Sequence, residues 1–155
     1  VQELQEIDFA ELVDEVRENL KFFEGANEMQ FDVQIDPCTG FVTDLFRLRI
    51  VLSNLMSNAM KYQRLDVHEH RVDIKVMCKE DSVELVVEDN GTGIADDQQA
   101  LVFNMFQRAD AKQSGSGIGL YIVKEALEKL SGSIELRSVP DQGTTFTCSI
   151  PNLKK

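Results

Sequence analysis

The sequence lacks long apolar runs, and this absence excludes the most common kind of membrane span. No run approaches the roughly 20 apolar residues that a helix needs to cross a bilayer, and no signal-peptide pattern opens the chain. Internal repeats and low-complexity tracts are also missing. Its 155 residues are 43% hydrophobic and 28% charged, which is typical of a soluble globular protein. We therefore expect one domain, residues 1–155, without direct membrane contact.

Cysteine, histidine and positive charge are scarce. Cys38, Cys78 and Cys148 are odd in number and lack CxxC spacing, so we expect buried thiols of a reducing compartment and no disulfide or zinc site. His68 and His70 have no evident third partner for a metal, and exposed loop histidines are the simpler interpretation. The net charge of -11 argues against nucleic-acid binding. It does not exclude an anionic ligand, because a local cation or helix N-terminus can override the global charge.

Periodic apolar positions are what the sequence does contain, and they predict two layers. Helical spacing predicts helices over residues 8–24, 44–62 and 118–130, with Asp44 as an N-cap and Gly132 as a terminator. Alternation predicts strands over residues 29–36, 41–43, 71–78, 82–89, 133–139 and 144–150. Because the strands alternate, one sheet face is covered by helices and the other is wet, which predicts a two-layer α/β sandwich. Residues 90–116 break the pattern and are expected to form a mobile loop with a helical turn near 101–108.

The segment "VVEDNGTGI" places an acid at the end of an apolar strand. Asp89 shares its side of the strand with Val83, Leu85 and Val87, and is therefore expected to point into the helix-covered layer. A carboxylate buried there needs hydrogen-bond donors or it costs several kcal/mol. Taken alone, an Asp that caps the following turn explains the segment equally simply.

Three polar residues lie on one edge of the second predicted helix. Asn54, Asn58 and Lys61 are spaced i, i+4 and i+7, so they share one side of the helix. Amide oxygens suit Mg²⁺, and a lysine one turn further on can meet a phosphate. A solvated polar stripe is the simpler alternative.

Two further segments suggest a ligand. Glycines 115, 117 and 119 precede and open the third helix, so its N-terminal N–H groups can approach an anion. A dinucleotide-binding motif would need a strand directly upstream, which is missing, and a flexible loop remains the alternative. On the last strand, Thr144 is expected to face inward beside Asp89. A purine amine and an ordered water could satisfy both side chains.

Taken together and in order, these segments resemble one family over essentially the whole chain. Residues 54–62 resemble its N box, "EDNGTGI" its first glycine box, "VFNMF" its F box, "GSGIGL" its second glycine box and "GTTF" its last. The family is the catalytic ATP-binding domain of sensor histidine kinases, within the superfamily that includes DNA gyrase and MutL. The resemblance implies the Bergerat fold: a mixed, mostly antiparallel sheet of about five strands, covered on one face by three helices.

The resemblance also implies roles for individual residues. Asp89 would accept from the adenine amine, with Thr144 joining through water, and Asn58 with Asn54 would hold Mg²⁺ against the phosphates. Lys61 and Tyr62 would flank phosphates and base, and Arg108 would steady the phosphates from a lid packed by Phe103 and Phe106. The other positions that these boxes imply for nucleotide binding are Gly91, Gly93, Ile94, Gly115, Ser116, Gly117, Ile118, Gly119 and Leu120.

The reaction implied is phosphoryl transfer from ATP to a histidine of a separate helical hairpin. Asn54 stands where hydrolytic relatives carry a glutamate base, so ATP should be held for transfer. Residues 1–7 would end a linker from that hairpin, which carries dimerisation, so the chain alone is expected to be a cytoplasmic monomer. A response regulator would act downstream, and the parent protein could be membrane-anchored. A hydrolytic or Ser/Thr-directed relative and a non-catalytic nucleotide sensor are the alternatives.

Overall fold

The computed structural model describes residues 3–22, 29–62, 69–104 and 119–154. Its helices are α1 (Phe9–Leu20), α2 (Leu45–Lys61), α3 (Asp96–Gln99) and α4 (Gly119–Lys129). Its strands are β1 (Leu4–Glu6), β2 (Met29–Ile35), β3 (Val42–Asp44), β4 (His70–Cys78), β5 (Ser82–Asp89), β6 (Ser133–Val139) and β7 (Gly143–Pro151).

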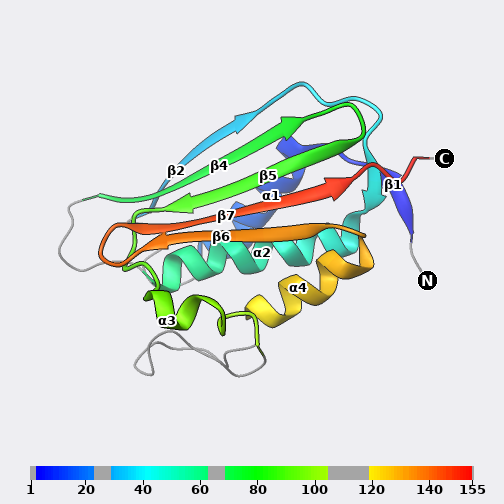
Figure 1. Ribbon diagram of the computed structural model, residues 1–155. Coiled ribbons are helices and arrows are strands. Elements are labelled where there is room, and N and C mark those ends of the chain that lie inside the picture. Colours follow the sequence, from blue (N-terminus) through cyan, green and yellow to red (C-terminus); the bar gives the residue numbers. More distant parts are fainter. Residues whose placement is uncertain (1–2, 23–28, 63–68, 105–118, 155) are drawn as a thin grey trace.

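Five strands form one sheet in the order β2-β4-β5-β7-β6. The β2–β4 pair is parallel and the other three pairs are antiparallel. Figure 1 shows α1, α2 and α4 on the same face of this sheet. The predicted two-layer α/β sandwich, with a mixed and mostly antiparallel sheet under three helices, is therefore confirmed.

The core lies between the sheet and the three long helices. Val83, Leu85 and Val87 of β5 are each 1% exposed, and Phe146 of β7 is equally buried. Alternating positions of β5 are more exposed, as the period of a strand covered on one face requires. Within the described residues, no helix combines the length and the apolar character that crossing a membrane requires.

The start of α2 is fixed by Asp44, as the sequence predicts. Its carboxylate accepts hydrogen bonds from the backbone N–H groups of Phe46, at 3.0 Å, and Arg47, at 3.3 Å. The Arg47 guanidinium also donates to Asp44 at 2.6 Å. Asp44 is only 3% exposed, so these donors offset the cost of burying its charge. The cap sets the start of the helix, and thereby the direction in which the later residues of α2 point.

Several element boundaries differ from the predicted ones. The first helix ends at Leu20 instead of residue 24. Helix α3 was not predicted and precedes the expected turn at 101–108, of which residues 101–103 form a turn and residues 105–108 lie outside the described residues. The left-handed residue after α4 is Ser131, with φ 60°, whereas Gly132 donates its N–H to Leu127 O at 2.7 Å. The sequence analysis also missed β1, which pairs with β3 in a separate two-stranded sheet.

The expectation of three unpaired thiols is wrong. Cys38 and Cys78 form a disulfide, with their Cα atoms 5.8 Å apart and a separation of 40 positions in the sequence. The parallel pairing of β2 with β4 brings the ends of these strands together, since Ile35 lies opposite Val76. A pairing between distant strands leaves no spacing signal in the sequence. Cys148 is free and buried, as expected.

Candidate functional site

Asp89 is a buried acid at the end of β5. It is 7% exposed, and its carboxylate accepts the backbone N–H of Gly91 at 2.9 Å. Burial raises the pKa of this carboxyl from 3.8 to about 6, although hydrogen bonds from the backbone of Gly91 and Thr144 act in the opposite direction. Desolvation disfavours the charged form, and a ligand that donates a hydrogen bond would favour it again. The prediction that Asp89 points into the helix-covered layer is confirmed by its burial.

Thr144 lies directly opposite Asp89 in the β5–β7 register. It is 5% exposed, and its hydroxyl oxygen lies 2.9 Å from that of Ser138. Ser138 also accepts the backbone N–H of Ile94 at 2.7 Å. The two hydroxyls therefore form a connected polar pair beside the acid. Sequence reasoning missed Ser138, although alternation along β6 puts it on the same side as the half-buried Ile134 and Leu136.

The loop after Asp89 is fastened to the end of α2. Thr92 donates its backbone N–H to Tyr62 O at 2.8 Å. A Cβ on Gly91 would collide with that same Tyr62 carbonyl and would lie 2.9 Å from the Asp89 carboxylate. Only glycine lets the two backbones approach this closely. The predicted base-binding acid and the end of the polar helix are thus held next to each other.

Gly93 joins the same loop to the β6–β7 turn. Its φ is +72°, a left-handed conformation that favours glycine, and a Cβ there would meet Val139 O. Asp141 donates its backbone N–H to Thr92 O at 2.7 Å, and the neighbouring Ile94 is 3% exposed. Residues 91–94 therefore connect three elements that border the site: α2, β5 and the β6–β7 turn.

The amides of α2 lie near the start of α4. Asn54 and Asn58 are partly exposed and Lys61 is exposed. The Asn54 side chain donates through Nδ2 to Ile50 O at 2.8 Å. Its Oδ1 lies 3.2 Å from where a Cβ on Gly119 would be. The described start of α4 is thus next to a polar oxygen of α2, and N–H groups in the first turn of a helix are of the kind that can bind an anion.

The described side chains could coordinate a hard cation such as Mg²⁺ only if a bound ligand supplied further oxygen atoms. In the described ranges, no group of three or more His, Cys, Asp and Glu residues could hold a metal ion. Asn54 and Asn58 instead offer neutral amide oxygens, and the bond of Asn54 to Ile50 O uses its Nδ2 group and not its Oδ1 oxygen. Mg²⁺ commonly takes one or two protein oxygens and completes its octahedron with phosphate and water. The residues present therefore fit Mg²⁺ bound together with a nucleotide.

Several predicted positions fall outside the described residues: Phe106, Arg108, Gly115, Ser116, Gly117, Ile118 and His68. Of the remaining positions, Gly119 is the first residue of α4, and Leu120 is 8% exposed as part of the core. Phe103 packs edge-on against Phe146, with ring centroids 6.2 Å apart. The first phenylalanine of the predicted F box is therefore packed against the core.

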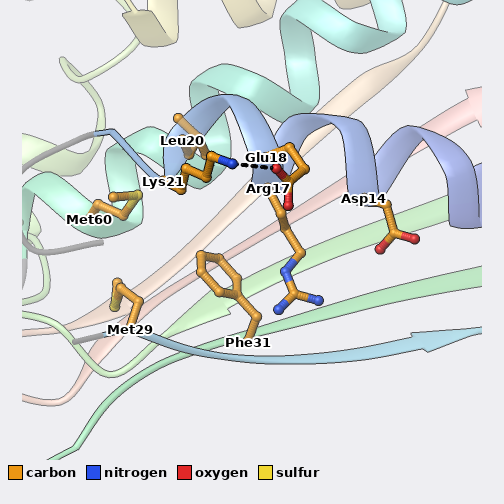
Figure 2. Close-up of a pocket in the computed structure, with 8 residues that line it drawn as sticks. All are labelled: Asp14, Arg17, Glu18, Leu20, Lys21, Met29, Phe31 and Met60. Carbon is orange, nitrogen blue, oxygen red and sulfur yellow. Dashed lines mark hydrogen bonds and ion pairs between the residues drawn. The ribbon is translucent and has the colours of Figure 1, made fainter. Parts of the chain in front are cut away.

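A cavity between α1 and β2 is separate from these residues. Figure 2 shows the side chains that line it, with Arg17 and Phe31 lying close to each other. Its volume is about 480 Å³, and the Arg17 guanidinium lies 5.1 Å from the centroid of the Phe31 ring. None of the predicted site residues lines this cavity. Asp89, Ser138 and Thr144 border a different and smaller cavity of about 200 Å³.

The architecture and the pairing of a buried acid with an amide-bearing helix define the class: a nucleotide-binding α/β sandwich domain. The chain belongs to the family of histidine kinase-, DNA gyrase B-, and HSP90-like ATPases, whose profile matches residues 43–154. The family resemblance seen in the sequence is therefore confirmed.

Individual relatives are sensor proteins. The chain is 37% identical over 134 residues to the sensor-like histidine kinase SenX3 of Mycolicibacterium smegmatis, covering 81% of this chain and 34% of the relative. It is 32% identical over 150 residues to the sensor protein SrrB of Staphylococcus aureus, covering 92% of this chain and 24% of the relative. The chain thus corresponds to about a third or less of these longer proteins.

Solved structures agree with the fold. The mycobacterial sensor histidine kinase MprB superposes with a TM-score of 0.80 at 25% identity, and the match covers all of both chains. Full-length ShkA in complex with AMPPNP superposes with a TM-score of 0.85 at 24% identity, covering all of this chain and 32% of that one. The catalytic domain of histidine kinase ThkA gives a TM-score of 0.81 at 23% identity, covering 97% of each.

Proposed function

We propose that this domain binds Mg²⁺-ATP and donates the γ-phosphoryl group to a histidine on a separate helical hairpin of its parent kinase. The observation that carries the proposal is the position of buried Asp89 and Thr144, joined through Gly91 and Tyr62 to the helix that bears Asn54 and Asn58. Family membership and the sensor kinases among the relatives support it. An ATP-dependent role of this kind favours a cytoplasmic location for the domain.

The base end of the site is built to accept a donor. An ionised Asp89 can only accept hydrogen bonds, so it favours the exocyclic amine of adenine. The O6 of guanine is an acceptor and would face the carboxylate unfavourably. The hydroxyls of Thr144 and Ser138 lie within hydrogen-bond distance of each other and can hold a water beside the base. The domain should therefore select ATP over GTP.

The phosphate end combines amides, a lysine and a helix terminus. Asn58 and Asn54 would hold Mg²⁺, which supplies charge neutralisation to the phosphates when bound. Lys61, one turn beyond Asn58, would meet a phosphate as a point charge. Gly119, Leu120 and the preceding glycine segment would offer N–H groups of the α4 N-terminus. Arg108 would complete the set of cationic groups in the site.

The identity of residue 54 favours transfer over hydrolysis. An amide cannot take up a proton from water at neutral pH, so Asn54 is no general base. Its Nδ2 group is moreover bonded to the backbone of its own helix. The bound ATP would therefore remain unhydrolysed until the hairpin docks. Docking would align the imidazole of its histidine for in-line attack on the γ-phosphoryl group.

Asn58→Ala is expected to remove most of the magnesium dependence of ATP binding. The wild type should bind ATP at least about tenfold more tightly with Mg²⁺ than with EDTA, and the variant should show a difference below about threefold. Calorimetric titration in both buffers measures this ratio. The matched control is Asn19→Ala, which removes an exposed amide from α1 and should preserve the wild-type ratio. An unchanged ratio in Asn58→Ala would contradict the proposed metal ligand.

The chain alone is expected to bind nucleotide as a monomer without phosphorylating itself. Incubation with labelled ATP should leave no acid-labile label, whereas addition of the parent's histidine-bearing hairpin should produce label on the hairpin. A response regulator added afterwards should receive that phosphoryl group. Label at His68 or His70 would contradict the proposal, and steady release of phosphate without the hairpin would favour a hydrolytic relative. ATP binding without transfer to any hairpin would favour a nucleotide-sensing role.

A further inference from the structure

The Cys38–Cys78 disulfide lies outside the proposed nucleotide site. Both residues are partly exposed and pack at the margin of the core. The third cysteine, Cys148, is fully buried, and burial raises the pKa of its thiol to about 12. A thiol is reactive as the thiolate, so Cys148 takes no part in exchange under physiological conditions. The two cysteines that solvent reaches are therefore the two that are joined.

The bridge fastens an edge strand and the turn that follows it. Strand β2 stands at the edge of the sheet, and Cys38 lies in the connection from β2 to β3. In that connection, Gly40 donates its N–H to the Glu6 carboxylate at 2.8 Å, and Phe41 O accepts the N–H of Ile7 at 2.9 Å. The disulfide is thus linked by two hydrogen bonds to the N-terminal segment of the described chain.

The N-terminal segment and the turn that carries Cys38 also border the same cavity. Residues 6–10 and residues 35–38 line one cavity of about 580 Å³. Phe9 and Phe41, which flank this region, pack with ring centroids 5.5 Å apart. Release of Cys38 from Cys78 would remove the covalent link between this turn and β4, which leaves the hydrogen bonds of Gly40 to Glu6 and Asn152 to hold the turn.

We propose that Cys38 and Cys78 are a reversible redox site, whose disulfide fixes the β2–β3 connection and, through Glu6 and Ile7, the N-terminal strand β1. Disulfides in the reducing cytosol are usually transient and redox-sensing, because thiol reductants act on them continuously. The cytosolic setting rests on the proposed ATP-dependent function. Partial exposure gives small thiols and disulfides access to both sulfur atoms.

The exchange needs a low-molecular-weight disulfide such as oxidised glutathione. One cysteine thiolate attacks a sulfur of this disulfide and releases the first glutathione thiolate, which leaves a mixed disulfide on the protein. The second cysteine thiolate attacks the protein sulfur of that mixed disulfide and releases the second glutathione. Two protein thiols and one oxidised glutathione thus become one protein disulfide and two reduced glutathione molecules. Excess reduced glutathione runs the same steps backwards.

The redox site is distant from the base-binding acid. Cys78 pairs with Val83 at one end of the β4–β5 ladder, whereas Asp89 pairs with Val72 at the other. The two pairs lie six strand positions apart, about 20 Å along the sheet. We therefore expect oxidation to change the N-terminal segment while leaving nucleotide affinity unchanged within about twofold.

A redox titration of the folded chain tests reversibility. The protein is equilibrated in buffers with varied ratios of reduced to oxidised glutathione, the thiols are trapped by alkylation, and peptides are measured by mass spectrometry. Cys38 and Cys78 should convert together in a single two-electron transition, and Cys148 should be alkylated only after denaturation. Cys148→Ala should leave the transition unchanged. A disulfide that persists in excess reduced glutathione, or thiols that never pair in oxidised glutathione, would overturn the proposal.

Hydrogen exchange tests what the bridge holds. Reduction should speed exchange of the Ile7 and Gly40 amides at least about fivefold, while the Leu85 amide in the central strand stays protected. Cys38→Ser and Cys78→Ser should each show the reduced pattern even under oxidising conditions. Equal exchange in both states would contradict the coupling to β1. Calorimetric titration of the same samples with ATP tests the proposed function separately from the redox site. If neither the oxidised nor the reduced protein bound ATP, the proposed function would be refuted, whereas the redox result would remain valid.

Discussion

Asp89→Asn is expected to weaken ATP binding by about 2–3 kcal/mol, roughly 30- to 150-fold, because a buried charged acceptor for the adenine amine is lost. The amide oxygen of Asn can still accept the Gly91 N–H, so the loop should keep its conformation. Calorimetric titration with ATP at neutral pH measures the loss. The matched control is Glu135→Gln, which neutralises an exposed carboxyl on β6 and should bind ATP normally.

The same substitution should stabilise the domain without nucleotide. Burial raises the pKa of Asp89 from 3.8 to about 6, so the folded state holds a proton that the unfolded state has already released. The wild type therefore loses stability as pH rises from about 4 to about 6, by up to about 3 kcal/mol. Asn cannot ionise, so the variant should be the more stable protein above pH 6. Urea unfolding at several pH values measures this difference.

The pH dependence of binding provides a second readout of the same carboxyl. Because the amine of adenine needs an ionised acceptor, affinity should fall as pH drops below about 6, by about tenfold per pH unit. ATP itself titrates nearby, so the informative quantity is the difference between wild type and Asp89→Asn. If the affinities of the two proteins changed with pH in parallel, or if the variant bound ATP as tightly as the wild type, Asp89 would not be the acceptor of the adenine amine.

Phe146→Ala is expected to destabilise the domain by about 3–5 kcal/mol, since truncation of a fully buried aromatic leaves a cavity. Phe146 is 1% exposed and contacts Phe103 edge-on. It lies two residues from Thr144 and opposite Val87 in the β5–β7 register. The loss should therefore loosen both the support of the base-binding residues and the packing of Phe103. Chemical denaturation followed by circular dichroism measures the change in the free energy of unfolding.

The matched control is Phe46→Ala, which makes the same truncation on the exposed side of α2. Phe46 is 67% exposed, so its removal should change the free energy of unfolding by less than about 0.5 kcal/mol. Equal losses in the two variants would mean that burial at Phe146 is not what stabilises the sheet. A Phe146→Ala variant with an unchanged free energy of unfolding would likewise contradict the role of Phe146 in the core.

The sequence by itself determined the layers of the fold and the sides of the strands and helices on which the candidate site residues lie. Apolar alternation on β5 requires Val83, Leu85, Val87 and Asp89 to share a face, because successive strand residues point to opposite sides. Asp44 could be assigned as a cap because a carboxylate before a helix satisfies free N–H groups locally. Asn54 and Asn58 followed from helical spacing in the same way. Each of these inferences depends on neighbours within a few residues, where chain geometry is fixed.

Only the tertiary structure decided which distant segments meet. The parallel pairing of β2 with β4 brings Cys38 to Cys78, and the antiparallel pairing of β6 with β7 brings Ser138 beside Thr144. Strand β1 likewise forms only because β3 lies beside it. Strand alternation sets which face a residue occupies, but strand order and register depend on the packing of the entire core. The redox pair and the second hydroxyl of the site therefore required the folded chain.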